Sequence, residues 1–261
     1  MKKVSTILCI LLIFILIFTL SACKDYGYDT QTTYNGMKFW FVPEKSENGK
    51  DYYYIAGNLE NKTVKNYFMP MFVNGLPVRS FGWTGMVTPI YMNLYNFALQ
   101  KLYMPGTIIK QSSGYRYIDS IHQDMQIYYC GEVIDLYKIY PYESESHKID
   151  YYVPAEKLDD FANIYGTTTT IKPDNILVFK ANISYRLNSE DMCEYYYVDN
   201  IESGSKIQNI PPEPTRAGYT FGGWYTEKEC TIKWDFDNVP TVSNNDDSFV
   251  EFALYAKWTK N

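Results

Sequence analysis

The segment Thr215-Arg216-Ala217-Gly218-Tyr219-Thr220-Phe221-Gly222-Gly223-Trp224-Tyr225-Thr226 carries the clearest structural pattern in the 261-residue chain. Its large rings, Tyr219, Phe221 and Trp224, are separated by small or polar residues, as in strands that bury one face. The pair Gly222-Gly223 permits a positive φ or a close backbone approach beside Trp224. The segment therefore predicts a strand in a compact β-rich module.

Two later stretches continue this pattern, Trp234-Asp235-Phe236 and Leu254-Tyr255-Ala256-Lys257-Trp258-Thr259. Together with residues 215–226 they closely resemble the Listeria-Bacteroides repeat, also called the internalin B-repeat. The resemblance covers residues 183–259 and implies a small β-grasp-like fold of the kind found in bacterial surface proteins. We expect the rings of the motif to pack in a core, with a ligand-stacking surface as the alternative. The motif residues are Gly218, Tyr219, Phe221, Gly223, Trp224, Trp234, Phe236, Leu254, Tyr255 and Trp258.

Short strand-like runs fill residues 36–166, separated by Gly, Pro, Asn and Ser. The chain holds 27 Tyr and 14 Phe, and aromatic and β-branched residues favour half-buried strands. Residues 167–182, which include four consecutive threonines and a proline, predict a linker to the C-terminal module. The predicted fold class is therefore mainly β, with two structural units.

The segment from Met69 to Gly82 resembles the opening of BspA-like leucine-rich repeats, through Val73-Asn74-Gly75-Leu76-Pro77-Val78-Arg79-Ser80-Phe81-Gly82. Residues 99–108, 126–131 and 149–154 resemble later strand-and-turn units of such an array. Few leucines follow the family spacing, so the resemblance implies a degenerate leucine-rich-repeat-like strand stack rather than a regular horseshoe. Helical spacing of Leu158, Phe161, Ala162 and Tyr165, after Pro154 and before Gly166, predicts a helix over residues 154–165. This helix would cover the last strand of that stack.

An aromatic residue, an aliphatic residue and a proline recur as a triplet four times in this region. The triplets begin at Phe41, Phe68, Tyr103 and Tyr152, at intervals of 27, 35 and 49 residues. Proline ends a strand because it cannot donate a ladder hydrogen bond. Because the intervals are uneven, we interpret the triplets as strand ends of a tyrosine-rich sheet rather than as a true repeat.

The first 22 residues read as an export signal, with Lys2-Lys3, an apolar run from Ile7 to Phe18, and the small residues Ser21-Ala22 directly before Cys23. The apolar run is shorter than the ~20 residues that cross a bilayer as a helix. The segment Leu20-Ser21-Ala22-Cys23 resembles the lipobox of bacterial lipoproteins. This resemblance implies lipidation of Cys23 and a tether over residues 23–35. Cleavage near Ala22 without lipidation, and a permanent membrane helix, are the alternatives.

Removal of residues 1–22 would leave 22 Lys+Arg against 30 Asp+Glu, a formal charge of −8. Such a charge argues against nucleic acid as a partner. Three cysteines would remain unlipidated, Cys130, Cys193 and Cys230. We expect them to be unpaired core residues, although a disulfide between Cys193 and Cys230 is possible because both lie in the C-terminal module.

No G-x-S-x-G, H-E-x-x-H, phosphate-binding glycine-rich loop or EF-hand loop occurs in the sequence. His122 and His147 belong to no metal or catalytic motif. The alternative is a cluster of carboxylates that acts as a glycosidase or calcium site, formed by Asp119, Asp124, Glu132 and Asp135. Acidic surface loops are, however, expected in a chain of this charge. We therefore predict no enzyme, no cofactor and no metal.

The sequence as a whole predicts a lipoprotein on the extracellular face of a bacterial membrane. Its expected role is non-enzymatic binding or adhesion toward a protein or glycan ligand, with the C-terminal repeat as a spacer or a second contact. A structural role in the cell envelope is the alternative, and an extracellular carbohydrate-active enzyme is a further one.

Overall fold

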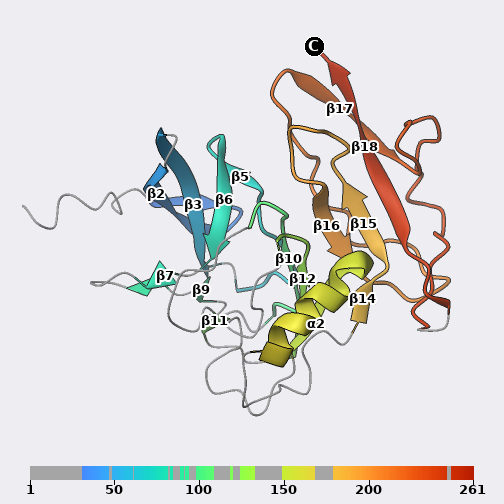
Figure 1. The fold of residues 1–261 in the computed structure, drawn as a ribbon, viewed down its shortest axis with the longest axis horizontal. Helices are drawn as coiled ribbons and strands as arrows, with labels where there is room; N and C mark the ends of the chain where they lie inside the picture. Colours follow the sequence, from blue (N-terminus) through green and yellow to red (C-terminus); the bar gives the residue numbers. More distant parts are fainter. Residues whose placement is uncertain are drawn as a thin grey trace, which may run out of the picture.

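The structure, a computed structural model, confirms a mainly β protein with several sheets and one short α-helix among the residues it describes (Figure 1). The described residues are 31–46, 49–60, 62–81, 83–84, 89–90, 92–93, 98–108, 118–119, 124–132, 149–167, 179–245 and 248–261. Cys23 and the predicted export signal lie outside them.

The N-terminal sheet has the strand order β1-β2-β3-β6-β5. Its strands are β1 (Gln31–Tyr34), β2 (Met37–Ser46), β3 (Gly49–Leu59), β5 (Phe72–Val73) and β6 (Leu76–Phe81). Two of its turns are Asn-Gly pairs in which both residues have positive φ, with 47° and 79° at Asn35-Gly36 and 49° and 78° at Asn74-Gly75. This backbone conformation matches the twist of a tight hairpin and explains the sequence of both turns.

The second sheet is entirely parallel, and its strands lie side by side in chain order. They are β4 (Asn66–Phe68), β10 (Lys101–Met104), β12 (Met125–Tyr129), β13 (Ile149–Pro154) and β14 (Phe179–Ala181). This order agrees with a stack of strand units, while membership in the leucine-rich repeats remains a prediction. Strand β14 lies within residues 167–182, so part of the range predicted as a linker belongs to the sheet.

Three of the four sequence triplets fall in register across this sheet. Phe68 pairs with Tyr103, Tyr103 with Tyr128, and Tyr128 with Tyr152. Our interpretation that the triplets only mark strand ends was therefore incomplete, because the uneven spacing reflects connections of different length between aligned strands. The fourth triplet, at Phe41, lies in β2 of the other sheet.

The parallel sheet is buried on both faces. One face packs against the N-terminal sheet in a core that includes Phe39, Leu102, Ile127 and Tyr151. The helix predicted over residues 154–165 is confirmed as the turn η2 (Ala155–Lys157) followed by α2 (Leu158–Thr167). The buried ring of Phe161 lies 5.8 Å from that of Tyr129 and covers this face near the end of the stack.

The C-terminal module is a four-stranded mixed sheet in the order β16-β15-β18-β17. Its strands are β15 (Ile183–Arg186), β16 (Tyr195–Asp199), β17 (Tyr219–Tyr225) and β18 (Phe252–Lys260). The two central strands, β15 and β18, are parallel, and both edges are antiparallel. Residues 182–245 and 248–261 contain no α-helix, and the β-grasp assignment remains a prediction.

Four short strands form two small two-stranded sheets beside these three. They are β7 (Trp83–Thr84) with β8 (Pro89–Ile90), and β9 (Met92–Asn93) with β11 (Ile118–Asp119).

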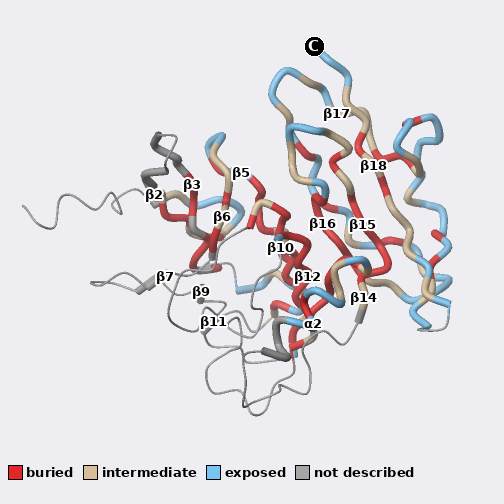
Figure 2. The backbone as a smooth tube through the Cα atoms, in the orientation of Figure 1, coloured by how far each residue is buried: buried red, intermediate tan, exposed pale blue. Residues whose placement is uncertain are grey.

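The second face of the parallel sheet packs directly against strand β16 of the module. On the side of the parallel sheet, this contact is made by a row of aromatic residues at positions 68, 103, 128 and 152. We call the contact between this row and β16 the seam. Buried residues are concentrated in β10, β12, β15 and β16, on the two sides of the seam (Figure 2). The module and the parallel sheet therefore share one hydrophobic core, which is not the arrangement expected for a module that serves only as a spacer.

Candidate functional site

The seam is built around a ladder of stacked rings. Ring centroids lie 4.1 Å apart between Phe68 and Tyr103, and 4.6 Å apart both between Tyr103 and Tyr128 and between Tyr128 and Tyr152. Side chains in register on neighbouring parallel strands repeat at about this strand spacing, which explains the near-parallel rings. Tyr197 of β16 closes the ladder from the module, because its ring meets that of Phe68 edge-on at 5.1 Å.

The seam also contains a buried carboxylate. Asp199, the last residue of β16, is 1% exposed, and its Oδ1 accepts a hydrogen bond from the Tyr103 hydroxyl at 3.2 Å. The Lys101 ammonium lies 3.8 Å from the same oxygen. Burial raises the pKa of the Asp199 carboxyl above its usual range, and Lys101 opposes that shift only in part. The seam is thus an apolar contact with one costly polar group inside it.

The residues of the repeat motif mostly build the module's own core. Trp224 and Leu254 are buried, and the Trp224 ring meets that of Tyr185 edge-on at 5.1 Å. The Trp258 indole donates to the Leu187 carbonyl at 2.6 Å. Gly218 and Gly223 have φ of 77° and 107°, a region that favours glycine. Gly223 lies where the pairing of β17 with β18 shifts register between Phe221 and Trp224.

Two motif rings line a shallow groove of mixed apolar and charged residues on the module surface, which also includes Lys233, Asp235 and Asp237. Trp234 and Phe236 lie there beside Ile207 and the exposed Ile210, in a space of about 610 Å³. The Phe221 ring of the motif meets that of Trp224 edge-on at 5.3 Å. Tyr219 is half-buried, and the guanidinium of Arg216 lies over its ring, 3.8 Å from the centroid.

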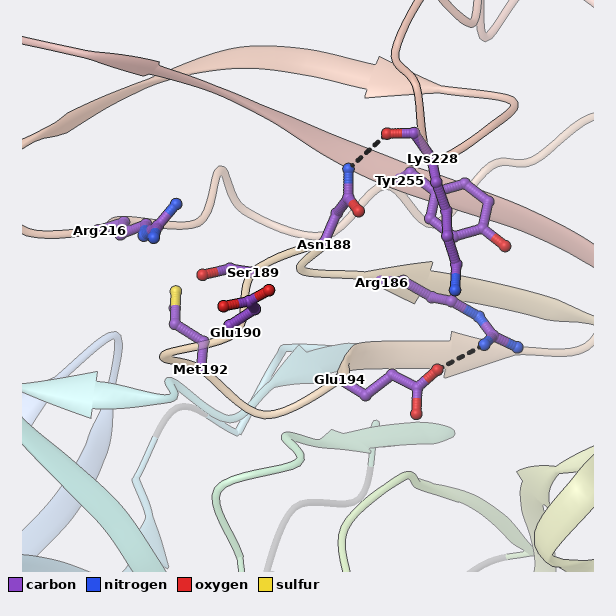
Figure 3. A pocket seen from close by; sticks show the side chains of 9 residues that line it. All are labelled: Arg186, Asn188, Ser189, Glu190, Met192, Glu194, Arg216, Lys228 and Tyr255. Atoms are coloured by element: carbon purple, nitrogen blue, oxygen red, sulfur yellow. Dashed lines mark hydrogen bonds and ion pairs between the residues drawn. The ribbon is translucent and has the colours of Figure 1, made fainter.

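The larger groove, of about 690 Å³, is polar and carries both signs of charge (Figure 3). We call it the Arg186 groove. It is lined by Arg186, Asn188, Ser189, Glu190, Met192, Glu194, Arg216, Lys228 and Tyr255. The Lys228 side chain runs past the Tyr255 ring toward Arg186, while Glu190 and Met192 form the facing wall.

Arg186 is held by carboxylates from three parts of the chain. Its guanidinium lies 2.7 Å from Glu194, 3.4 Å from Glu251 and 3.6 Å from Glu156. Glu156 belongs to η2, outside the module, and it also accepts a hydrogen bond from the Tyr195 hydroxyl. A guanidinium with several carboxylate partners is fixed in orientation, so the groove has a rigid centre tied to both structural units.

The structure describes the acidic residues that we considered as a carboxylate cluster only in part. Asp124 and Glu132 are exposed. Asp135, His122, His147 and the side chain of Asp119 lie outside what the structure describes. Within the described segments, no group of three His, Cys, Asp or Glu side chains is placed to hold a metal ion. In the same segments, no helix is long and apolar enough to cross a bilayer.

Cys130, Cys193 and Cys230 are all free thiols in the structure. Cys230 contacts the Asn188 amide and the Ala256 carbonyl, at 3.4 Å and 3.7 Å. Cys193 lies 3.3 Å from the Tyr195 carbonyl instead. The unpaired state that we favoured agrees with this arrangement.

Sequence reasoning missed the seam and the Arg186 groove. The triplets that begin at Phe68, Tyr103 and Tyr152 did indicate the ladder. Placing the triplets opposite one another on neighbouring strands, whatever their spacing in the sequence, would have predicted it. No sequence pattern marks Asp199 or Arg186, because Tyr103 and Lys101 at Asp199, and Glu156 and Glu251 at Arg186, lie far away in the chain.

Comparison with known proteins confirms the repeat in the C-terminal module. Residues 182–257 match the Listeria-Bacteroides repeat domain. A predicted membrane protein of Evansella cellulosilytica is 32% identical over 96 residues, which is 36% of this chain and 13% of that protein. Internalin H of Listeria monocytogenes is 43% identical over 51 residues, 20% of this chain and 8% of that protein. The chain thus spans a small part of these relatives, and no solved structure matches it.

Proposed function

We propose that this protein is a cell-surface lipoprotein, anchored through Cys23, that binds a protein or glycan ligand without chemical turnover. The match to the Listeria-Bacteroides repeat domain and the similarity to internalin H support a surface location. The export signal and the lipobox-like Leu20-Ser21-Ala22-Cys23 support a lipid anchor, since acyl chains on one residue give stable attachment to a membrane.

The single observation that carries the binding proposal is the Arg186 groove, whose central guanidinium is paired with three carboxylates. Rigid sites lose little conformational freedom when they bind, which favours affinity. Arg186 is fixed by Glu194, Glu251 and Glu156, while Lys228 and Glu190 remain available at the rim. A groove with both signs of charge suits a ligand with hydrogen-bonding and charged groups, such as a protein loop or an acidic glycan.

The test is binding of residues 24–261 to protein and glycan arrays, with one variant in the groove and one outside it. Lys228→Glu reverses a charge at the groove, and Lys206→Glu makes the same change at an exposed residue whose partner is Asp237, also exposed. We expect a binder whose signal falls at least tenfold with Lys228→Glu and stays within twofold with Lys206→Glu.

Silence of the wild-type chain on both arrays would reject the binding role and leave the structural envelope role. Conversion of an array glycan to a smaller product would instead support a carbohydrate-active enzyme. Lipidation is tested separately, by labelling cells with an alkyne fatty acid, and Cys23→Ser should abolish the label.

A further inference from the structure

We propose that Cys130 and Cys193 are a disulfide-forming pair that can staple the C-terminal module to the parallel sheet across the seam. Cys130 follows strand β12 of the parallel sheet, and Cys193 precedes strand β16 of the module. This pairing differs from the one between Cys193 and Cys230 that the sequence left open.

The two sulfur atoms lie against consecutive residues of β16, one against each. Cys130 Sγ is 3.5 Å from the Tyr196 carbonyl oxygen, and Cys193 Sγ is 3.3 Å from the Tyr195 carbonyl oxygen. Cys130 Sγ is also 3.5 Å from the carbonyl oxygen of Met104, two residues before Gly106. A Cβ atom on Gly106 would lie 3.2 Å from Cys193 Sγ, so that sulfur reaches the same end of the sheet.

Lys157 provides a further link between the two thiols. Its ammonium donates to the carbonyl of Gly131 at 3.0 Å, next to Cys130, and lies over the Tyr195 ring at 5.5 Å. Burial raises the pKa of both thiols, that of Cys130 well above its usual value, and the Lys157 charge opposes this shift in part at each of them. Cys230 shares none of these neighbours among the described residues, since its sulfur lies by Asn188 and Ala256.

The two thiols differ in access, which sets the order of reaction. Cys130 is 2% exposed, whereas Cys193 is half-buried. Burial raises the pKa of Cys193 to about 11, so its thiolate is scarce and oxidation is slow at neutral pH. A small disulfide oxidant would first be attacked by the Cys193 thiolate, which gives a mixed disulfide and releases one thiol. The Cys130 thiolate would then attack the Cys193 sulfur and release the second thiol. The two protons lost by the cysteines end on the two released thiols.

Oxidation would matter because it closes a long loop between the two structural units. Disulfides form and persist in proteins outside the cytoplasm, where the export signal would place this chain. The staple would stabilise the seam by restricting the unfolded chain, as disulfides that close long loops do. The proposal does not depend on the ligand of the Arg186 groove.

The experiment uses residues 24–261, which retain every described residue. The reduced protein is incubated with oxidised glutathione, digested without reduction and analysed by mass spectrometry. We expect a peptide pair joined through Cys130 and Cys193 that lacks two hydrogen atoms relative to its dithiol form. A Cys193–Cys230 link, or glutathione adducts and free thiols alone, would overturn the proposal.

Melting temperature gives a second readout with matched variants. The oxidised wild type should melt about 5–10 °C above the reduced protein. Cys193→Ser should remove that difference, while Cys230→Ser should retain it. Cys193 is the better site for substitution, because Cys130 is fully enclosed in the core and its replacement risks misfolding.

Discussion

The Tyr103 hydroxyl donates a hydrogen bond to Oδ1 of Asp199 at 3.2 Å, and this contact joins the parallel sheet to the last residue of β16. Oδ2 of the same carboxylate has no hydrogen-bond partner among the residues that the structure describes. A buried charge with incomplete hydrogen bonding costs free energy. The seam therefore gains specificity of alignment from Asp199 but loses stability when the carboxyl ionises.

This cost predicts the pH dependence of the seam. Because the pKa of Asp199 is raised above its usual 3.8, its contribution to stability is complete below that value and falls as pH rises through the folded pKa. Asp199→Asn keeps an acceptor for Tyr103 without the charge. We expect the variant to be more stable than wild type at pH 7, by on the order of 1 kcal/mol, and equal to it near pH 3. The groups that act on the Asp199 carboxyl include the Lys101 ammonium, the Asn200 backbone N–H, which donates to Oδ1 at 2.8 Å, and the Asn209 side chain. The tyrosines around it are Tyr103, Tyr128, Tyr152 and Tyr185.

Urea denaturation at several pH values measures this effect. Lys101→Met provides the opposite control, since loss of the ammonium should lower stability at neutral pH. A variant Asp199→Asn that is less stable than wild type at every pH would show that the carboxylate is a net stabiliser.

The aromatic ladder predicts a large difference between two changes at Tyr128. Tyr128→Ala removes a ring that stacks on both Tyr103 and Tyr152, and it leaves a cavity at the seam. We expect a loss of about 3–5 kcal/mol in the free energy of unfolding. Tyr128→Phe keeps the ring and loses only the hydroxyl, which donates to Gln126 Oε1 at 3.0 Å, so about 1 kcal/mol should be lost. Equal losses for the two variants in chemical denaturation would mean that the hydroxyl, not the ring, dominates.

Gly106 lies where the parallel sheet and the C-terminal module approach each other closely. A Cβ at this position would lie 2.5 Å from the backbone oxygen of Tyr195, which cannot move without shifting β16. Gly106→Ala should therefore destabilise the protein by about 1–3 kcal/mol. Gly222→Ala is a matched control, because the nearest atoms to its Cβ belong to the flexible Lys257 side chain at 3.4 Å. Thermal melting measures both variants. Equal melting temperatures for Gly106→Ala and Gly222→Ala would mean that the seam is not closely packed at Gly106.

The sequence was informative where the pattern is local. Ring alternation at Tyr219, Phe221 and Trp224 predicted strand β17, and the spacing of Leu158 and Phe161 predicted the helix α2. It was uninformative about the seam, because Tyr103 and Asp199 are 96 residues apart and nothing in either segment specifies the other. Half-buried and fully buried tyrosines also look alike in a sequence, so the second buried face of the parallel sheet was not visible.

The shared core makes a final prediction about the folding unit. A chain that ends near Pro173 would lack β16 and would expose the row of Tyr103, Tyr128 and Tyr152 to water. Large exposed aromatic patches promote association, so this fragment should bind a hydrophobic dye and aggregate. Residues 24–261 should instead unfold in one transition, with calorimetric and van't Hoff enthalpies that agree. Addition of a separate fragment from residue 174 onward should reduce dye binding by the first one, because β16 would cover the ladder again. Two well-separated transitions in the intact chain would mean that the module folds alone and that the seam contributes little to stability.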